Sequence, residues 1–196
     1  EGLDYVSIVA SNDLDEFLVE SLKNQKAKIS IWGIGTKLVT AYDNPSLGAV
    51  YKLTALKNEG NKWEKKIKLS EQKIKINTPG INNVMRFRKE NKFFGDMIYE
   101  KNSKIQKFKM IDPNDSTRKK VFNKNYIIEN LLIPIFKKGK LTYKIPSIEH
   151  IKKKLSVDLD LLDNSHKRLN NPHTYPVGIE ENLFLEKQKM ILKLRK

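Results

Sequence analysis

The stretch that decides the fold is Ile29-Ser30-Ile31-Trp32-Gly33-Ile34-Gly35-Thr36-Lys37-Leu38-Val39-Thr40. Its first four residues are typical of a buried strand, the next four form a glycine-containing turn, and Lys37 begins either a helix or a loop. Because glycine adopts positive φ at little cost, two glycines around one residue let the backbone turn sharply and expose consecutive N–H groups. Such amides, followed by the hydroxyl of Thr36, suit a phosphate group. Taken alone, however, a Gly-x-Gly after a strand is more often only a tight strand exit.

A second strand is predicted upstream, over residues 5–10, because this run is apolar, β-branched and typical of a strand buried on both sides. Ser11 or Asn12 is then expected to cap a helix over residues 13–24, whose apolar residues recur at helical spacing. Strand, helix and strand within about 30 residues predict a βα unit with parallel strands. Ligands of parallel sheets bind beyond the carboxyl ends of the strands. Ser11-Asn12 and Gly33–Thr36 follow two such ends, so we expect them to face one crevice.

The sequence pattern in the middle of the chain is typical of an antiparallel sheet. Short strands are predicted over residues 50–56, 65–69, 84–88 and 96–99, with Asn, Gly and Pro between them. The first of these has no cleanly polar side, so it is expected to lie between two layers. Asn58-Glu59-Gly60-Asn61 is the expected hairpin turn.

The last third of the chain is predicted to be mainly helical. Residues 119–136 carry apolar side chains mostly at helical spacing, and Pro134 would end that helix. Gly139 is expected at a hairpin tip over residues 136–141. Ser147 should cap a helix that turns Ile148, Ile151 and Leu155 inward and continues to about Leu169. An extended segment at residues 175–177 and an amphipathic helix over 182–194 complete the pattern.

Composition excludes several classes of protein. The net charge of +15 comes from 38 basic residues, but these are mostly lysines scattered among asparagines, which favours a solvated surface over a nucleic-acid face. A basic nucleic-acid-binding module is kept as the alternative. No apolar run approaches the ~20 residues that span a bilayer, and no signal-peptide pattern is seen, so we expect a cytoplasmic protein without membrane contact. The absence of cysteine excludes disulfides and thiolate metal sites.

Few side chains in this sequence have a catalytic pattern. His150, His166 and His173 lack metal-ligand spacing, and His166 near Asp163 is expected to form a solvated pair. Acidic residues 13, 15 and 16 could bind Mg²⁺, but in the first turn of a helix they more often interact with the helix dipole. Lys37 is expected to face either a phosphate or the solvent.

Several motifs, in order along nearly the whole chain, resemble nicotinate phosphoribosyltransferase, and in particular the C-terminal portion of that enzyme. They are Ser11-Asn12-Asp13-Leu14-Asp15-Glu16, Trp32–Thr40, Gly48-Ala49-Val50-Tyr51-Lys52-Leu53, Lys68-Leu69-Ser70, Thr78-Pro79-Gly80, Val84-Met85-Arg86, Gly95-Asp96, Arg168-Leu169-Asn170-Asn171-Pro172 and Tyr175-Pro176-Val177. The resemblance implies an α/β fold: the end of an irregular type II phosphoribosyltransferase α/β barrel, followed by an antiparallel β region and C-terminal helices. Accordingly, residues 1–46 would hold the last βα units of the barrel. Residues 47–112 would form the antiparallel region that packs on the missing N-terminal part, and residues 113–196 a mainly helical C-terminal region.

The resemblance also implies an activity. The family condenses nicotinate with phosphoribosyl pyrophosphate to nicotinate mononucleotide and pyrophosphate, using ATP hydrolysis and Mg²⁺, in the synthesis of NAD. Residues matching the family's ribose and phosphate loops are Ser11, Asn12, Gly33, Gly35 and Thr36. The phosphorylated histidine and the arginine that binds the nicotinate carboxylate lie upstream in the family. No catalytic residue and no metal ligand is therefore assigned here, and this fragment is expected to be inactive alone. The family forms homodimers, and a non-catalytic phosphate-binding remnant is the other alternative.

Overall fold

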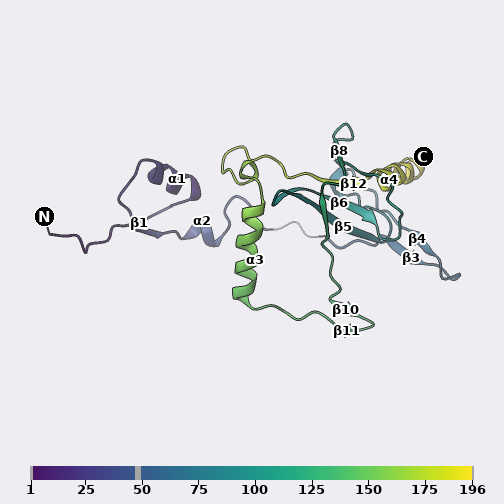
Figure 1. The fold of residues 1–196 in the computed structure, drawn as a ribbon, viewed down its shortest axis with the longest axis horizontal. Helices are drawn as coiled ribbons and strands as arrows, with labels where there is room; N and C mark the ends of the chain where they lie inside the picture. The colour runs from purple at the N-terminus through teal and green to yellow at the C-terminus, as the bar shows by residue number, and fades with distance from the viewer. Residues whose placement is uncertain (1, 47–49, 196) are drawn as a thin grey trace. The chain divides into compact units, whose positions relative to one another are not determined.

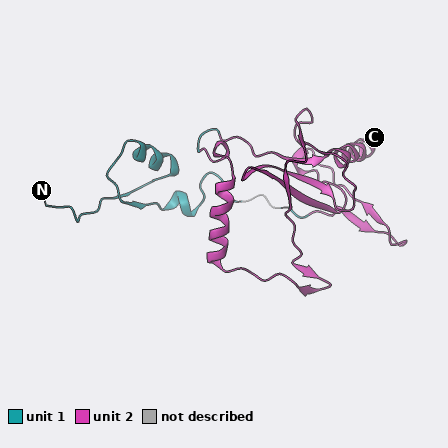
Figure 2. Ribbon diagram, viewed as in Figure 1, with its two compact units in different colours: residues 1–51, 169–171 teal, residues 52–168, 172–196 magenta. Residues whose placement is uncertain are grey.

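The computed structural model describes residues 2–46 and 50–195, in two compact units (Figure 2). Unit 1 comprises residues 1–51 and 169–171, and unit 2 comprises residues 52–168 and 172–196. Gly48 and Ala49, which belong to one of the family motifs, lie outside the described residues.

Unit 1 contains the predicted strand–helix–strand arrangement (Figure 1). Strand β1 (Val9–Ser11) pairs with β2 (Ile31–Gly33) in parallel, and helix α1 (Glu16–Asn24) connects them. A short helix, α2 (Thr36–Val39), follows the glycine turn. The prediction of parallel strands joined by a helix is thus confirmed, although both strands are shorter than the sequence pattern indicated.

The helix cap and the burial of these strands were predicted wrongly. Asp15, not Ser11 or Asn12, caps α1, because its Oδ1 accepts a hydrogen bond of 2.8 Å from the Leu18 N–H. Val9 and Ile31 are 59% and 49% exposed, whereas the sequence predicted buried strands. Two strands and two short helices supply too few layers to cover both faces of a sheet.

Unit 2 is built on a six-stranded sheet with the strand order β8-β7-β12-β6-β5-β9. Its strands are β5 (Asn82–Lys89), β6 (Lys92–Glu100), β7 (Phe108–Ile111), β8 (Lys119–Phe122), β9 (Ile127–Asn130) and β12 (Val177–Glu180). The β12–β6 pair is parallel and the other pairs are antiparallel, so the sheet is mixed. The predicted strands at 84–88 and 96–99 are the centres of β5 and β6.

Strand β12 enters the middle of this sheet from the far end of the sequence. Two glycines permit that insertion. A Cβ on Gly178 would lie 3.0 Å from the Ile111 carbonyl oxygen, and one on Gly95, where φ is +156°, would lie 3.0 Å from the Pro176 carbonyl oxygen. The Asp96 N–H donates to that same Pro176 oxygen at 3.0 Å. Close backbone approach therefore requires glycine on both sides of the inserted strand.

The sheet carries two clusters of buried side chains. In the first, Phe87 is fully buried and stacks on Phe122 with ring centroids 3.7 Å apart. In the second, Leu183 and Phe184 of helix α4 (Glu181–Leu194) pack on Ile111 and Ile179. The predicted C-terminal helix is confirmed, and Glu180 caps it through a hydrogen bond from the Leu183 N–H at 2.9 Å.

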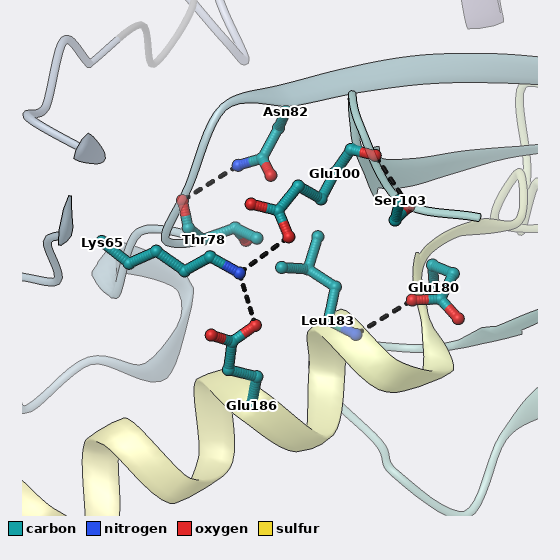
Figure 3. Close-up of polar contacts among 8 residues, drawn as sticks. All are labelled: Lys65, Thr78, Asn82, Glu100, Ser103, Glu180, Leu183 and Glu186. Atoms are coloured by element: carbon teal, nitrogen blue, oxygen red, sulfur yellow. Dashed lines mark hydrogen bonds and ion pairs between the residues drawn. The ribbon is translucent and has the colours of Figure 1, made fainter. Parts of the chain in front are cut away.

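A hairpin of β3 (Ala55–Lys57) and β4 (Trp63–Lys65) is held to this core by an ion-pair network. Figure 3 shows Lys65 between two carboxylates, with Nζ 2.7 Å from Glu100 of β6 and 2.6 Å from Glu186 of α4. Burial opposes the charged lysine, but the two hydrogen bonds prevail and raise the pKa of Lys65. The predicted turn at residues 58–61 is confirmed. The predicted two-layer burial of residues 50–56 is wrong, since Tyr51 and Leu53 are exposed.

The predicted helix over residues 119–136 is wrong, because this segment forms β8 and β9. Phe122 is 3% exposed and its neighbour Val121 is 50% exposed, which is the alternation of a strand with one face on the core. Pairing with β7 and β5 satisfies backbone groups that a helix would satisfy internally, so tertiary contacts override the local spacing. The hairpin that follows is as predicted: β10 (Phe136–Lys137) pairs with β11 (Lys140–Leu141), and Gly139 has φ of +75°.

Helix α3 (Ile148–Leu161) begins where the sequence predicted, with the Ser147 hydroxyl accepting from the His150 N–H. It ends at Leu161 and not near Leu169, and a short 3-10 turn, η2 (Asn164–His166), follows it. Ile148, Ile151 and Leu155, predicted to face inward, are 69%, 50% and 57% exposed. The apolar stripe of α3 is real, but no described segment covers it.

Candidate functional site

The two predicted phosphate loops begin side by side, at the carboxyl ends of β1 and β2. Ser11 and Gly33 are direct partners in the parallel register, so the two loops begin at adjacent positions. A Cβ on Gly33 would lie 3.1 Å from the Ser11 Cβ and 3.4 Å from the Ala10 carbonyl oxygen. Gly33 therefore serves the close approach of the strands, and the structure brings the two predicted loops together.

Asn12 follows Ser11 in the left-handed region, with φ of +82°. Asparagine tolerates this conformation better than most residues. Asp13 is also left-handed, at φ of +48°, so the chain turns twice before α1 begins. Ser11 is therefore the last residue of β1, Asn12 begins the loop that follows it, and neither residue caps the helix.

Gly35 and Thr36 form the second loop. Gly35 lies at the N-terminal end of α2, where its carbonyl accepts from the N–H groups of Leu38 and Val39. A Cβ built on Gly35 meets no atom within 4 Å, in contrast to Gly33. The loop is thus open on the side of Gly35, where a ligand can approach the backbone. Thr36 begins the helix, and its carbonyl accepts from the Thr40 N–H and hydroxyl.

Lys37 pairs with the cap of the neighbouring helix. Its Nζ lies 2.6 Å from Asp15 Oδ2, and the ring of Tyr42 lies 5.6 Å from the same nitrogen. This hydrogen bond raises the pKa of Lys37 and lowers the pKa of Asp15. The ion pair links α1 to α2 and so holds the two loops in register. The sequence predicted that Lys37 faces either a phosphate or the solvent, and it did not predict the ion pair with Asp15.

The remaining candidates do not form a site. Among residues 2–46 and 50–195, no three His, Cys, Asp or Glu side chains gather in a way that could hold a metal ion. His166 uses Nδ1 to contact the His173 carbonyl at 2.6 Å, while Asp163 accepts from the Ser165 N–H and hydroxyl. Asp163 therefore organises its own turn and does not orient a catalytic imidazole.

Sequence reasoning assigned no role to a buried polar network in unit 2. The Arg86 guanidinium binds Asp96 with two hydrogen bonds, of 2.8 and 2.7 Å, and Tyr175 donates to the same carboxylate at 2.9 Å. The hydrogen bonds to Asp96 raise the pKa of Arg86. Burial first, and then the charge of Asp96, raise the pKa of Tyr175. All three residues belong to the family motifs, but only the pairing of β5, β6 and β12 brings them together.

The sequence of this chain is similar to those of known proteins from several organisms. Residues 81–187 match the family model described as nicotinate phosphoribosyltransferase C-terminal domain. The chain is 38% identical over 195 residues to nicotinate phosphoribosyltransferase of Bacillus subtilis, covering 97% of this chain and 39% of that protein. It is 33% identical over 185 residues to nicotinate phosphoribosyltransferase of Caenorhabditis elegans, covering 91% of this chain and 32% of that protein.

A solved structure has the same fold. The crystal structure of human nicotinic acid phosphoribosyltransferase superposes with a TM-score of 0.65 and 22% sequence identity, over 99% of this chain and 34% of that chain. The class of protein is therefore a domain with a mixed sheet and C-terminal helices, which corresponds to 34% of that longer chain. The chain belongs to the nicotinate phosphoribosyltransferase C-terminal domain family. It spans only 39% and 32% of the two relatives, and it corresponds to their C-terminal part.

Within the part of the chain that the structure describes, no helix is both long and apolar enough to cross a membrane.

Proposed function

We propose that this chain is the C-terminal part of a nicotinate phosphoribosyltransferase. The whole protein would condense nicotinate with phosphoribosyl pyrophosphate to nicotinate mononucleotide and pyrophosphate, coupled to ATP hydrolysis, in NAD salvage. The observation that carries this proposal is the family match over residues 81–187, together with relatives of that name aligned to nearly the whole chain.

In this proposal the two loops of unit 1 hold the ribose and its 5′-phosphate. Ser11 and Asn12 supply side-chain hydrogen bonds from one loop. Gly33 and Gly35 supply backbone N–H groups from the other, and the Thr36 hydroxyl donates to a phosphate oxygen. The adjacency of Ser11 and Gly33 and the open space at Gly35 support the assignment. Unpaired amides at the start of a helix favour an anion.

These residues would act on the reaction by positioning. The anomeric carbon passes through an oxocarbenium-like state as pyrophosphate leaves, so the rate depends on holding the ribose in place and stabilising the leaving group. The phosphorylated histidine and the nicotinate-binding arginine would come from the part of the protein upstream. This chain would therefore be inactive alone.

The cofactors, the barrel and the oligomeric state are proposed for the whole enzyme. Mg²⁺ and ATP would be required, but the described residues offer no cluster of carboxylates or histidines to hold the metal, so no step is assigned to it here. Unit 1 would contribute the last βα steps of an irregular type II barrel. Because one sheet contains strands from both residues 47–112 and residues 113–196, we propose these two predicted divisions as a single unit that follows residues 1–46. We also propose that the whole enzyme is a cytoplasmic homodimer.

The test is a calorimetric titration of nicotinate mononucleotide into the full-length protein and its Gly35→Val variant. A Cβ at this position meets no atom within 4 Å, but Gly35 has φ of −113° and ψ of −109°, which β-branched residues rarely adopt. Circular dichroism therefore establishes that the variant is folded, and a folded variant should block backbone approach and abolish binding. Gly60→Val, in the β3–β4 turn, is the matched control and should bind normally. Equal binding in all three proteins would move the phosphate away from this loop. No binding in any of them would favour a non-catalytic remnant.

A further inference from the structure

Unit 2 contains a cavity of about 320 Å³ that the proposed function does not use. It lies between the 3-10 turn η1 (Lys73–Lys75), the loop at residues 113–116 and helix α4. Three cationic side chains line it: Lys73, Lys187 and Arg195. No aspartate or glutamate is among the described residues that line it. A concave site with three positive groups and no carboxylate is suited to an anion.

Lys187 is the centre of the argument because it is buried. The residue is 7% exposed, and its Nζ donates to the Ile76 carbonyl at 2.9 Å and lies 3.5 Å from the Thr78 hydroxyl. Among residues 2–46 and 50–195, no carboxylate lies within ion-pair distance of this nitrogen. Burial, and then the charge of nearby Lys52, lower the pKa of Lys187. A buried cation with only neutral partners is costly unless an anion joins it.

Two other partly buried lysines of this unit have carboxylate partners, whereas Lys120 donates to the Phe94 carbonyl at 2.6 Å and lies near the rings of Phe94 and Phe122. Lys65 contacts two glutamates, and Lys109 lies 2.5 Å from Glu181. Lys187 differs from Lys65 and Lys109 because it has no carboxylate partner, and it differs from Lys120 because it lines a cavity that contains two further cationic side chains.

The nearest acidic residues on the lining loop are already engaged within that loop. Asp112 accepts from the Asn114 N–H at 2.8 Å, and Asp115 accepts from the Thr117 N–H and hydroxyl at 3.0 and 2.6 Å. The loop instead contributes Asn114 and Ser116 to the cavity lining, and both are neutral residues with hydrogen-bonding side chains. The charge of Lys187 is therefore not compensated by its own loop neighbours.

We propose that this cavity binds the phosphate group of a small molecule, with Lys187 as the buried cation and Lys73 and Arg195 as the exposed ones. A phosphate carries up to two negative charges and several acceptor oxygens, which match cationic donors flanked by a hydroxyl and amides. The remaining lining includes Ile76, Phe184 and Ile191, so an apolar or planar group beside the phosphate would also be accommodated. The volume is within the range of ligand pockets.

This site is distinct from the loops proposed to hold the ribose 5′-phosphate. Those loops belong to unit 1, whereas every residue lining this cavity belongs to unit 2. The inference stands whether or not the loops of unit 1 bind a nucleotide.

The experiment is a calorimetric titration of inorganic phosphate and of adenosine monophosphate into the full-length protein. All proteins carry Gly35→Val, so that the loop of unit 1 contributes no heat, and nicotinate mononucleotide titrated into proteins with Gly35 intact reports that loop separately. Lys187→Met should weaken binding about tenfold or more, and Lys73→Met, at an exposed position, about two- to fivefold. Lys189→Met is the matched control, since Lys189 is exposed on the same helix and does not line the cavity.

Adenosine without phosphate should not bind. Tighter binding of adenosine monophosphate than of inorganic phosphate would identify a phosphomonoester, and equal binding would identify free phosphate. Circular dichroism and thermal unfolding establish that Lys187→Met is folded, and Lys73→Met keeps the test informative if it is not. Phosphate affinities that are the same in the Lys187, Lys73 and Lys189 variants, or no binding at all, would overturn the proposal.

Discussion

Replacing Asp96 by asparagine should be among the most destabilising single changes in unit 2. Asp96 is 8% exposed and is the common acceptor for Arg86 and Tyr175, which joins β5, β6 and the segment before β12. The substituted amide would keep one acceptor oxygen and turn an NH₂ group toward the guanidinium. Arg86 would then be left without its counter-charge in a largely desolvated site.

The expected loss in the free energy of unfolding follows from the burial of the Arg86–Asp96 ion pair. Removing one partner of a buried ion pair costs about 3–5 kcal/mol, because the other charge is left uncompensated. The Arg86 side chain is 23% exposed, so water recovers part of that cost, and we expect a loss of about 2–4 kcal/mol. Arg86 also lies over the Phe93 ring at 4.3 Å, which keeps the guanidinium in place and limits its escape to solvent.

Urea unfolding followed by circular dichroism measures this loss as a shift of the midpoint at constant slope. Asp158→Asn is the control, because Asp158 pairs with Lys154 on the exposed surface of α3 at 2.5 Å. That change should alter the free energy of unfolding by less than about 0.5 kcal/mol. Equal losses for the two variants would refute the claim that burial gives the Asp96 network its strength.

Three further changes test the fold. Tyr175→Phe should cost about 1.5–3 kcal/mol at neutral pH, the value of a hydrogen bond to a charged group. Because burial and Asp96 raise the pKa of Tyr175 above its ordinary value of 10.0, the stability that its hydroxyl contributes is complete below pH 10 and is lost as the pH rises further. Urea unfolding at pH 8 and pH 11 should therefore show a smaller difference between wild type and variant at the higher pH. Gly178→Ala should cost about 1–3 kcal/mol, since its Cβ would lie 3.0 Å from the Ile111 carbonyl oxygen, and a midpoint unchanged in thermal unfolding would contradict this contact. Ser147→Ala should remove the cap of α3 at a cost of about 1 kcal/mol, which amide exchange would detect as about fivefold faster exchange in the first turn and unchanged exchange in α4.

Predictions from the sequence succeeded where local rules act. Ser147 and Gly139 lie at the helix start and hairpin tip that their residue types favour, and the parallel β1–β2 pair follows from strand and helix spacing alone. They failed at residues 119–136, where apolar residues at helical spacing form two strands. There the partners β5 and β7 decide the outcome, and a single segment carries no information about its partners.

For the two candidate phosphate loops, too, the sequence predicted the local turns and only the structure showed the contacts between them. Glycines after a strand indicate a turn from the sequence alone, but only the register shows that Gly33 faces Ser11 while Gly35 faces open space. The cap of α1 was misplaced because Ser11, Asn12 and Asp15 are all good capping residues, and the left-handed turns at Asn12 and Asp13 pass the role to Asp15.

The sequence by itself determined the family, the local turns and caps, and the strand–helix–strand unit, since each depends on neighbours within a few residues or on motifs that survive in order. The tertiary structure alone decided that β12 inserts between β6 and β7 and that Arg86 and Tyr175 both bind the buried carboxylate of Asp96. It also decided that Lys187 lines a cavity. These contacts join residues 10 to 111 positions apart. Their energies come from burial and from pairing across the sheet, and neither quantity exists until the chain has folded.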